Sequence, residues 1–157
     1  VPGPTAFATA LAISGMESGR FTFEGFLPMR PTRRRERLES LKYETRTMIF
    51  YEAPHKLLST LKDMNSVFGD RNIVVVKELT KIHETSWRGT LSEAVAYHTE
   101  NPPKGEYVLV LEGIDPKVLE EERQASWETM SIEDHVALYE SKGQTKKEAN
   151  PTTTQRI

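Results

Sequence analysis

The chain has 157 residues and a mass of 17.9 kDa, which suffices for one well-packed domain with some additional helix but not for two full domains. Hydrophobic residues make up 37% and charged residues 28%, a composition typical of folded domains rather than disordered or membrane proteins. The absence of cysteine excludes disulfides and thiolate metal sites and fits a reducing cytosol, so we expect a cytoplasmic protein. No apolar run approaches the ~20 residues of a membrane-spanning helix, so no membrane partner is expected.

The net charge of −2 conceals two oppositely charged regions. Between Met29 and Arg46, seven basic residues stand against three acidic ones, a balance of +4. Between Asp115 and Asp134, seven acidic residues stand against two basic ones, a balance of −5. The first region is therefore suited to a polyanion, which the second would repel.

Hydrophobic periodicity and turn residues predict alternating helices and strands over most of the chain. The first half of the chain is predicted to contain a helix over Ala6 to Ile13 ended by Gly15, a strand over Phe21 to Phe26, a charged helix over Thr32 to Leu41 and a strand over Thr45 to Tyr51. A helix follows, with Leu57, Leu58, Leu61 and Met64 at helical spacing. The remaining elements are strands over Ile73 to Val76 and His83 to Thr90, a helix over Leu91 to His98, and a strand over Tyr107 to Leu111. This order predicts an α/β fold with a mixed sheet of about five strands and flanking helices.

Four segments are expected from the change in character along the chain. Residues 1–18 begin with a Pro-Gly-Pro turn that feeds directly into a helix, so they are interpreted as the end of a truncated preceding domain. Residues 19–114 form the α/β domain. Residues 115–149 are expected to be a helical extension, with a helix starting at Ser131, and residues 150–157 a disordered tail.

Several kinds of catalytic site lack their signature in this sequence. The four histidines, His55, His83, His98 and His135, have no ligand-type spacing, so a metal site is not expected. A Gly-x-Ser-x-Gly elbow, a Gly-x-Gly-x-x-Gly loop and a phosphate-binding Lys loop are also missing.

Polar residues at strand ends remain as the main candidates, because ligands of open α/β sheets bind beyond the carboxyl ends of strands. Three segments share such a position: Tyr51 to Lys56, Lys77 to Lys81, and Lys104 to Tyr107. An alternative stays open, in which Glu52 and Glu78 form surface ion pairs worth under ~1 kcal/mol each. The arginine run from Arg33 to Arg37 is similarly open, since it is either a solvated helix face or a surface for RNA phosphates.

Six segments occur in an order that resembles a known family. They are Pro2-Gly3-Pro4-Thr5-Ala6, Phe23-Glu24-Gly25-Phe26-Leu27-Pro28, Phe50-Tyr51-Glu52-Ala53-Pro54-His55-Lys56, Glu78-Leu79-Thr80-Lys81 with Glu84, Arg88-Gly89-Thr90-Leu91, and Lys104-Gly105-Glu106-Tyr107-Val108-Leu109-Val110-Leu111-Glu112-Gly113. Together they resemble the bacterial small-subunit ribosomal RNA (cytidine-2′-O)-methyltransferases of the tetrapyrrole methylase superfamily. The chain resembles the C-terminal portion of such an enzyme.

The resemblance implies a two-domain enzyme that binds S-adenosyl-L-methionine between its domains and methylates the 2′-hydroxyl of a cytidine in the RNA of the small ribosomal subunit. It also implies that this chain alone is inactive, and it is compatible with a homodimer. Alternatives are a methyltransferase acting on a tetrapyrrole precursor and a non-catalytic RNA-binding module. The sequence departs from the family pattern at Lys56, where arginine is usual, and after Ala149.

The resemblance assigns candidate roles to residues of this chain. The catalytic candidates are Glu52, His55, Glu78 and Lys81. The cofactor-binding candidates are Thr5, Ala6, Tyr51, Glu52, Leu79 and Glu106. The RNA-binding candidates are Arg33, Arg34, Arg35, Arg37, Lys56 and Arg88.

Overall fold

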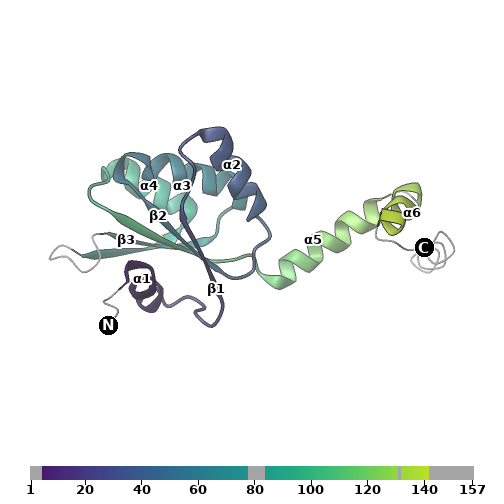
Figure 1. Ribbon diagram of the computed structural model, residues 1–157, viewed down its shortest axis with the longest axis horizontal. Helices are drawn as coiled ribbons and strands as arrows, with labels where there is room; N and C mark the ends of the chain where they lie inside the picture. Colours follow the sequence, from purple (N-terminus) through teal and green to yellow (C-terminus); the bar gives the residue numbers. More distant parts are fainter. Residues whose placement is uncertain (1–4, 78–83, 131, 142–157) are drawn as a thin grey trace. The chain divides into compact units, whose positions relative to one another are not determined.

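The computed structural model describes residues 5–77, 84–130 and 132–141. The chain divides into two compact units, Val1–Asp115 and Pro116–Ile157, which are treated separately below (Figure 1). No helix in the described ranges is long and apolar enough to cross a membrane.

The first unit alternates helices and strands in the predicted order. Its elements are α1 (Ala6–Ser14), β1 (Phe21–Phe26), α2 (Pro31–Ser40), β2 (Thr47–Glu52), α3 (Pro54–Phe68), β3 (Asn72–Lys77), β4 (Thr85–Thr90), α4 (Leu91–Glu100) and β5 (Tyr107–Leu111). Gly15 ends α1 in the left-handed conformation, with φ of 73°, as its position after the last apolar residue predicted. The strand predicted from Thr45 begins two residues later, at Thr47, and extends to Glu52.

The five strands form one mixed sheet in the order β1-β2-β5-β3-β4, which confirms the predicted fold class. Strand β1 is parallel to β2, and β5 runs antiparallel to both β2 and β3. Strands β1, β2 and β3 therefore run in the same direction. Their carboxyl ends lie at one edge of the sheet, together with the start of β5.

Helices cover the two faces of the sheet unequally. Helices α2, α3 and α4 lie on one face and α1 alone lies on the other (Figure 1). Side chains of β2 contribute to the hydrophobic cores on both faces of the sheet, because Met48 and Phe50 belong to the core beneath α2–α4 whereas Ile49 packs with the residues of α1. Each such buried side chain contributes roughly 1.5–3 kcal/mol relative to an exposed one. The sheet face beneath α1 is covered by fewer described helices than the other face, so side chains on it can be exposed.

The second unit consists of α5 (Pro116–Thr129) and α6 (Ile132–Ser141), in agreement with the expected helical extension. Trp127 stacks on His135 with 4.3 Å between ring centroids, and the Nε2 atom of His135 lies 2.7 Å from the carbonyl oxygen of Trp127. Most of the acidic stretch after Asp115 is α5, whereas the helix start that we located within the expected extension was Ser131. Ser131 and the tail 150–157 lie outside the described residues.

The predicted division between residues 18 and 19 stays a prediction. Helix α1 packs against β5 and β2, and it belongs to the same compact unit as the sheet. Ala10 and Leu11 of this helix are buried against the strands. The packing of α1 is thus continuous with the sheet in this structure.

Candidate functional site

The carboxyl edge of the sheet brings together the strand ends that the sequence singled out. Glu52 at the end of β2 and Lys77 at the end of β3 both pair with Tyr107 at the start of β5. Thr85 at the start of β4 pairs with Lys77. The predicted residues Glu78, Leu79 and Lys81 follow β3 directly but lie outside the described residues.

The carboxylate of Glu52 points into the protein rather than toward solvent. Glu52 is buried, with 3% of its surface exposed. Its Oε1 atom accepts the backbone N–H of Ala53 at 2.9 Å, and its Oε2 atom accepts the hydroxyl of Thr60 at 2.7 Å. Because Thr60 lies in α3, Glu52 ties the end of β2 to that helix. This arrangement gives Glu52 a structural role and differs from the predicted contact with substrate.

The other residues of this corner face different surroundings. Tyr51 points to the opposite face of the sheet from Glu52, where its ring packs on Phe23 and Phe26 of β1 with centroid distances of 5.2 and 5.5 Å. His55 is exposed in the first turn of α3. Lys56 is half-buried, and its backbone N–H donates to the carbonyl of Ala53. Among the described catalytic candidates, His55 is therefore the one that solvent can reach.

The remaining cofactor candidates lie on α1 and before β5. Thr5 is the exposed N-cap residue of α1, and its side chain forms no capping hydrogen bond. Ala6 is half-buried against the core beneath α1. Glu106 is exposed next to Tyr107, so it lies at the carboxyl edge with Tyr51. The first-turn N–H groups of α1 are left without a side-chain cap among the described residues.

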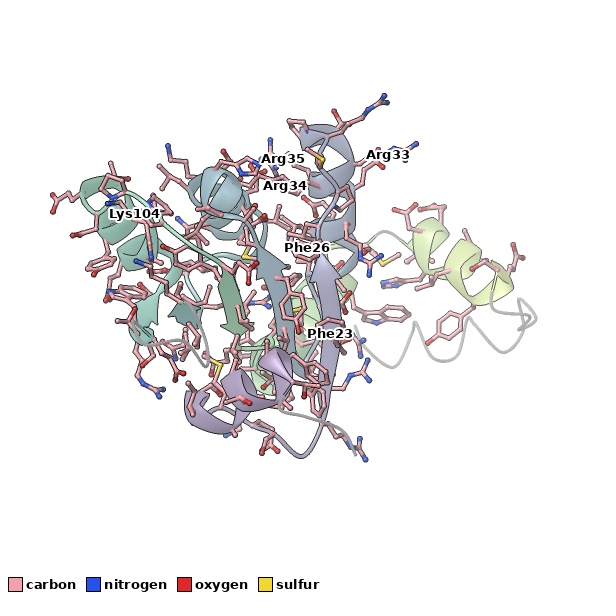
Figure 2. The ribbon with its side chains drawn as sticks, turned by 60° about the vertical axis from the view of Figure 1, so that its left-hand side comes forward. Phe23, Phe26, Arg33, Arg34, Arg35 and Lys104 are labelled. Atoms are coloured by element: carbon pink, nitrogen blue, oxygen red, sulfur yellow. The ribbon has the colours of Figure 1, made fainter. Side chains whose placement is uncertain are left out.

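The arginine run does not form one basic face. Arg34 is buried, and its Nε atom donates to Oδ2 of Asp63 on α3 at 2.7 Å. Arg35 donates to the hydroxyl of Ser66 at 3.0 Å, also on α3. Figure 2 shows Arg33 on the other side of α2 from Arg34 and Arg35. The guanidinium of Arg34 is therefore enclosed and already paired with Asp63, and RNA binding by this residue stays a prediction.

Two further predicted RNA-binding arginines also have partners within the fold. Arg37 forms an ion pair with Glu24 of β1, with 2.7 Å between Nη2 and Oε2. Arg88 of β4 donates to the carbonyl oxygens of Ile13 and Ser14 at the end of α1. Those carbonyls lack intrahelical partners, so Arg88 completes the hydrogen bonding of the helix end. Within the described ranges, Arg33 is the exposed arginine of the predicted set with neither an ion pair nor a side-chain hydrogen bond, since Arg35 and Arg88 form hydrogen bonds and Arg37 forms an ion pair.

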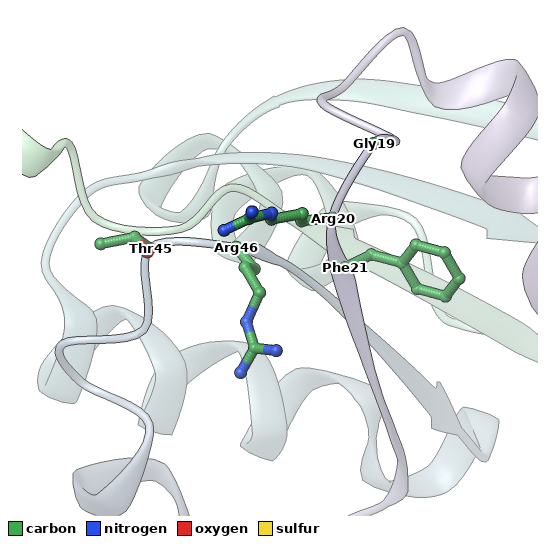
Figure 3. A pocket seen from close by; sticks show the side chains of 5 residues that line it. All are labelled: Gly19, Arg20, Phe21, Thr45 and Arg46. Atoms are coloured by element: carbon green, nitrogen blue, oxygen red, sulfur yellow. The ribbon is translucent and has the colours of Figure 1, made fainter.

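An open pocket lies at the opposite edge of the sheet, where β1 and β2 begin (Figure 3). It is lined by Gly19, Arg20, Phe21, Thr45 and Arg46. The guanidinium of Arg46 donates two hydrogen bonds to the carboxylate of Glu44, at 2.9 and 3.0 Å, and the backbone N–H of Arg46 donates a third at 3.0 Å. These bonds hold the pKa of Glu44 below its usual value and raise that of Arg46. The sequence analysis did not predict this pocket.

Exposed phenylalanines on β1 are a second feature that the sequence analysis missed. Phe21, Phe23 and Phe26 are 39%, 48% and 66% exposed. The sequence signal for these side chains was a pair of phenylalanines two positions apart in the predicted strand, with a glycine after them. The described part of the chain holds no group of three or more His, Cys, Asp or Glu side chains that could bind a metal ion.

Comparison with known proteins places the chain in a family. The sequence profile of the Tetrapyrrole (Corrin/Porphyrin) Methylases matches residues 1–95. The chain is 45% identical over 151 residues to the ribosomal RNA small subunit methyltransferase I of Synechocystis sp., covering 96% of the chain and 52% of that protein. It is 45% identical over 149 residues to the Bacillus subtilis protein of the same name, covering 95% of the chain and 51% of that protein.

Solved structures share the fold at lower sequence identity. The methyltransferase CobJ has a TM-score of 0.55 and 21% identity, over 71% of this chain and 49% of that one. The cobalt precorrin-4 methyltransferase CbiF has a TM-score of 0.52 and 22% identity, over 70% of this chain and 50% of that one. The chain spans about half the length of the curated relatives it matches. On the profile match over residues 1–95, the chain belongs to the tetrapyrrole methylase family.

Proposed function

We propose that the chain is part of an S-adenosylmethionine-dependent methyltransferase that modifies the RNA of the small ribosomal subunit. The observation that carries this proposal is the 45% identity over 151 residues to a protein named ribosomal RNA small subunit methyltransferase I. Tetrapyrrole methylases use S-adenosylmethionine as their methyl donor. The finer proposal is transfer to the 2′-hydroxyl of a cytidine by a cytoplasmic enzyme.

The residues at the carboxyl edge and on α1 suit part of a binding site for this donor. Thr5 is exposed at the start of α1, and the first-turn N–H groups have no side-chain cap, so a polar ligand atom has donors to meet there. Glu106 is an exposed carboxylate at the edge, and Tyr51 offers a half-buried ring. When bound, the donor supplies a methyl group on a positively charged sulfur. The chain would contribute one side of the site, with the remainder supplied by the rest of the protein.

Transfer to a ribose hydroxyl depends on holding the hydroxyl oxygen in line with the methyl group, so most of the rate should come from positioning. A neighbouring base that takes the hydroxyl proton adds to the rate. His55 is the exposed described candidate for this role at the edge. Glu52 would position the corner by linking β2 to α3. Glu78 and Lys81 stay candidates from the sequence.

The test uses a protein with the full length of the curated relatives. Incorporation of radioactive methyl groups from S-adenosylmethionine into small-subunit RNA is measured, and the modified nucleotide is identified by nuclease digestion and mass spectrometry. His55→Ala should lower the transfer rate while leaving the melting temperature unchanged, whereas Glu52→Gln should lower the melting temperature. Methylation of a base rather than a ribose would contradict the 2′-O proposal, and absence of transfer to RNA would contradict the RNA proposal itself.

The 157-residue chain alone serves as the comparison. We expect it to bind S-adenosylmethionine weakly and to transfer no methyl group, because only part of the site would be present. Titration calorimetry measures the affinity, and sedimentation measures whether the chain forms the homodimer that the resemblance allows. Micromolar affinity of the isolated chain would show that the described residues suffice for binding.

A further inference from the structure

We propose that the exposed aromatic side chains of β1 form a surface on which unpaired RNA bases stack. This aromatic row consists of Phe21, Phe23 and Phe26, buttressed by Phe7 of α1 and Tyr51 of β2. The choice of RNA as the partner rests on the proposed function. The row itself rests on the geometry of β1, whose own side chains have no role in the proposed transfer chemistry.

A β-bulge places all three phenylalanines on one face of the sheet. In a regular strand Phe21 and Phe23 share a face, but Phe26 would point to the other one. The register between β1 and β2 shifts between Phe23 and Gly25, so that Phe26 pairs with Tyr51. Gly25 has φ of 65°, a conformation that favours glycine. The bulge thus returns Phe26 to the face that carries Phe23, as its contact with Tyr51 confirms.

The rings form a connected series along the strand. Phe7 packs on Phe21 and Phe23 with centroid distances of 6.2 and 4.9 Å, and Tyr51 packs on Phe23 and Phe26 at 5.2 and 5.5 Å. The buttressing rings hold one side of the row while 39–66% of each phenylalanine on β1 remains exposed. Six strand residues span about 20 Å at ~3.3 Å each. That length has room for several bases at about 3.4 Å spacing.

The charges around the row favour a polyanion. Arg20 and Arg46 line the pocket at the start of β1, and Figure 3 shows their side chains on the other side of this strand from the ring of Phe21. Arg30 and Arg33 are exposed beyond the other end of β1, at the start of α2. Exposed arginines at both ends of an aromatic row match the alternation of bases and phosphates in a single strand.

Two acidic groups near the row are paired, whereas Glu106, at the carboxyl edge with Tyr51, is an exposed carboxylate. Glu24, the acid of β1, has its carboxylate bound to Arg37 of α2. Glu44 is bound to Arg46, although this pair reduces the charge that Arg46 contributes to the pocket. At the start of the strand, Arg20 therefore carries more of the attraction for phosphate than Arg46. A single-stranded RNA fits this pattern better than an apolar protein surface, because an apolar surface offers no anions to the arginines at the two ends of β1.

The experiment measures binding of the 157-residue chain to a fluorescein-labelled cytidine hexaribonucleotide by anisotropy, beside an RNA duplex of equal length. Phe23→Ala and Phe26→Ala should each weaken binding to the single strand roughly tenfold, the loss expected when one stacked base loses its platform. Phe26→Leu should weaken it nearly as much, since leucine stays apolar but offers no ring, whereas Phe26→Tyr should bind like wild type. Arg20→Gln should lower the slope of log affinity against log salt by about 0.7.

Matched controls separate stacking from loss of structure. Tyr43 is 52% exposed and lies outside the row, so Tyr43→Ala should leave binding unchanged. Each variant is checked for an unchanged melting temperature, which is expected because the replaced rings are largely exposed. The duplex should bind all phenylalanine variants equally, because its bases are already stacked.

Three results would overturn the proposal. The first is that the wild-type chain does not bind the single strand. The second is that Phe23→Ala and Phe26→Ala both bind with wild-type affinity. The third is that Phe26→Leu keeps wild-type affinity while Phe26→Ala loses it, which would indicate apolar contact instead of stacking. A change from dimer to monomer in these variants, with RNA binding intact, would assign the row to a contact between two copies. Methyl transfer by the longer protein is measured independently, so its absence would reject the proposed function and leave the stacking result standing.

Discussion

Replacement of Arg34 should separate structural from RNA-binding arginines in α2. Its Nε atom lies 2.7 Å from Oδ2 of Asp63, and the two side chains are 8% and 21% exposed. Removal of the arginine side chain leaves the carboxylate of Asp63 partly buried without this partner. Breaking a fully buried ion pair costs about 3–5 kcal/mol of unfolding free energy.

The remaining solvent access of Asp63 lowers this cost, and we expect about 2–3 kcal/mol for Arg34→Gln. Near the size of the first unit, each kcal/mol shifts the melting temperature by about 4 °C, so a decrease of about 8–12 °C is expected. Thermal unfolding followed by circular dichroism measures this shift, and urea unfolding gives the free energy directly.

Two variants test the reasoning. Arg35→Gln should change stability by less than about 0.5 kcal/mol, because Arg35 is exposed. The double variant Arg34→Met with Asp63→Leu should recover most of the loss, since apolar residues of similar volume can replace a buried pair. If Arg34→Gln and Arg35→Gln melt within 2 °C of each other, the ion pair with Asp63 does not hold α2 on α3. Arg33→Gln should leave stability unchanged in the same assay while weakening RNA binding.

Three other variants test the site and the core. Burial lowers the pKa of His98, so below about pH 6.5 the unfolded chain takes up a proton before the folded chain does, and the free energy of unfolding falls. His98→Phe should remove this dependence of the unfolding free energy on pH between about pH 7 and 5. An unchanged dependence would assign it to other groups. Glu52→Ala should cost about 1.5–3 kcal/mol in urea unfolding, because the Thr60 hydroxyl and the Ala53 N–H lose a charged acceptor, and a loss below 0.5 kcal/mol would contradict that role. Gly113→Ala should cost about 1–3 kcal/mol, because its Cβ would meet the carbonyl oxygen of Thr45 at 2.2 Å, and wild-type stability would show that the backbone adjusts freely.

The order of helices and strands could be predicted from the sequence because it depends on local signals. Alternating aromatics identified β1, a continuous apolar run identified β5, and Gly15 marked the end of α1. Strand-end positions could be predicted for the same reason, since a turn follows each buried run directly. These strand ends share one edge of the sheet because β2 and β3 run in the same direction. The antiparallel pairing of β5 with both strands sets that direction.

The roles of individual polar side chains depended on residues far along the chain. Arg34 and Asp63 are 29 positions apart, and Arg88 reaches Ser14 across 74 positions. Nothing local in the arginine run distinguishes Arg34 from Arg33, because a helix turns by about 100° per residue and each faces a different neighbour. Packing of α2 on α3 therefore decided which arginine is buried and which is exposed.

The sequence by itself determined the α/β class, the strand positions and the likeness to a methylase family, all of which rest on residue patterns within short segments. Only the tertiary structure decided that Glu52 turns inward to Thr60 and that Phe26 shares a face with Phe23. The physical reason is that strand alternation fixes faces only while the register is regular. One extra residue, Glu24, reverses the face of everything after it in β1, and its effect appears only when β1 pairs with β2.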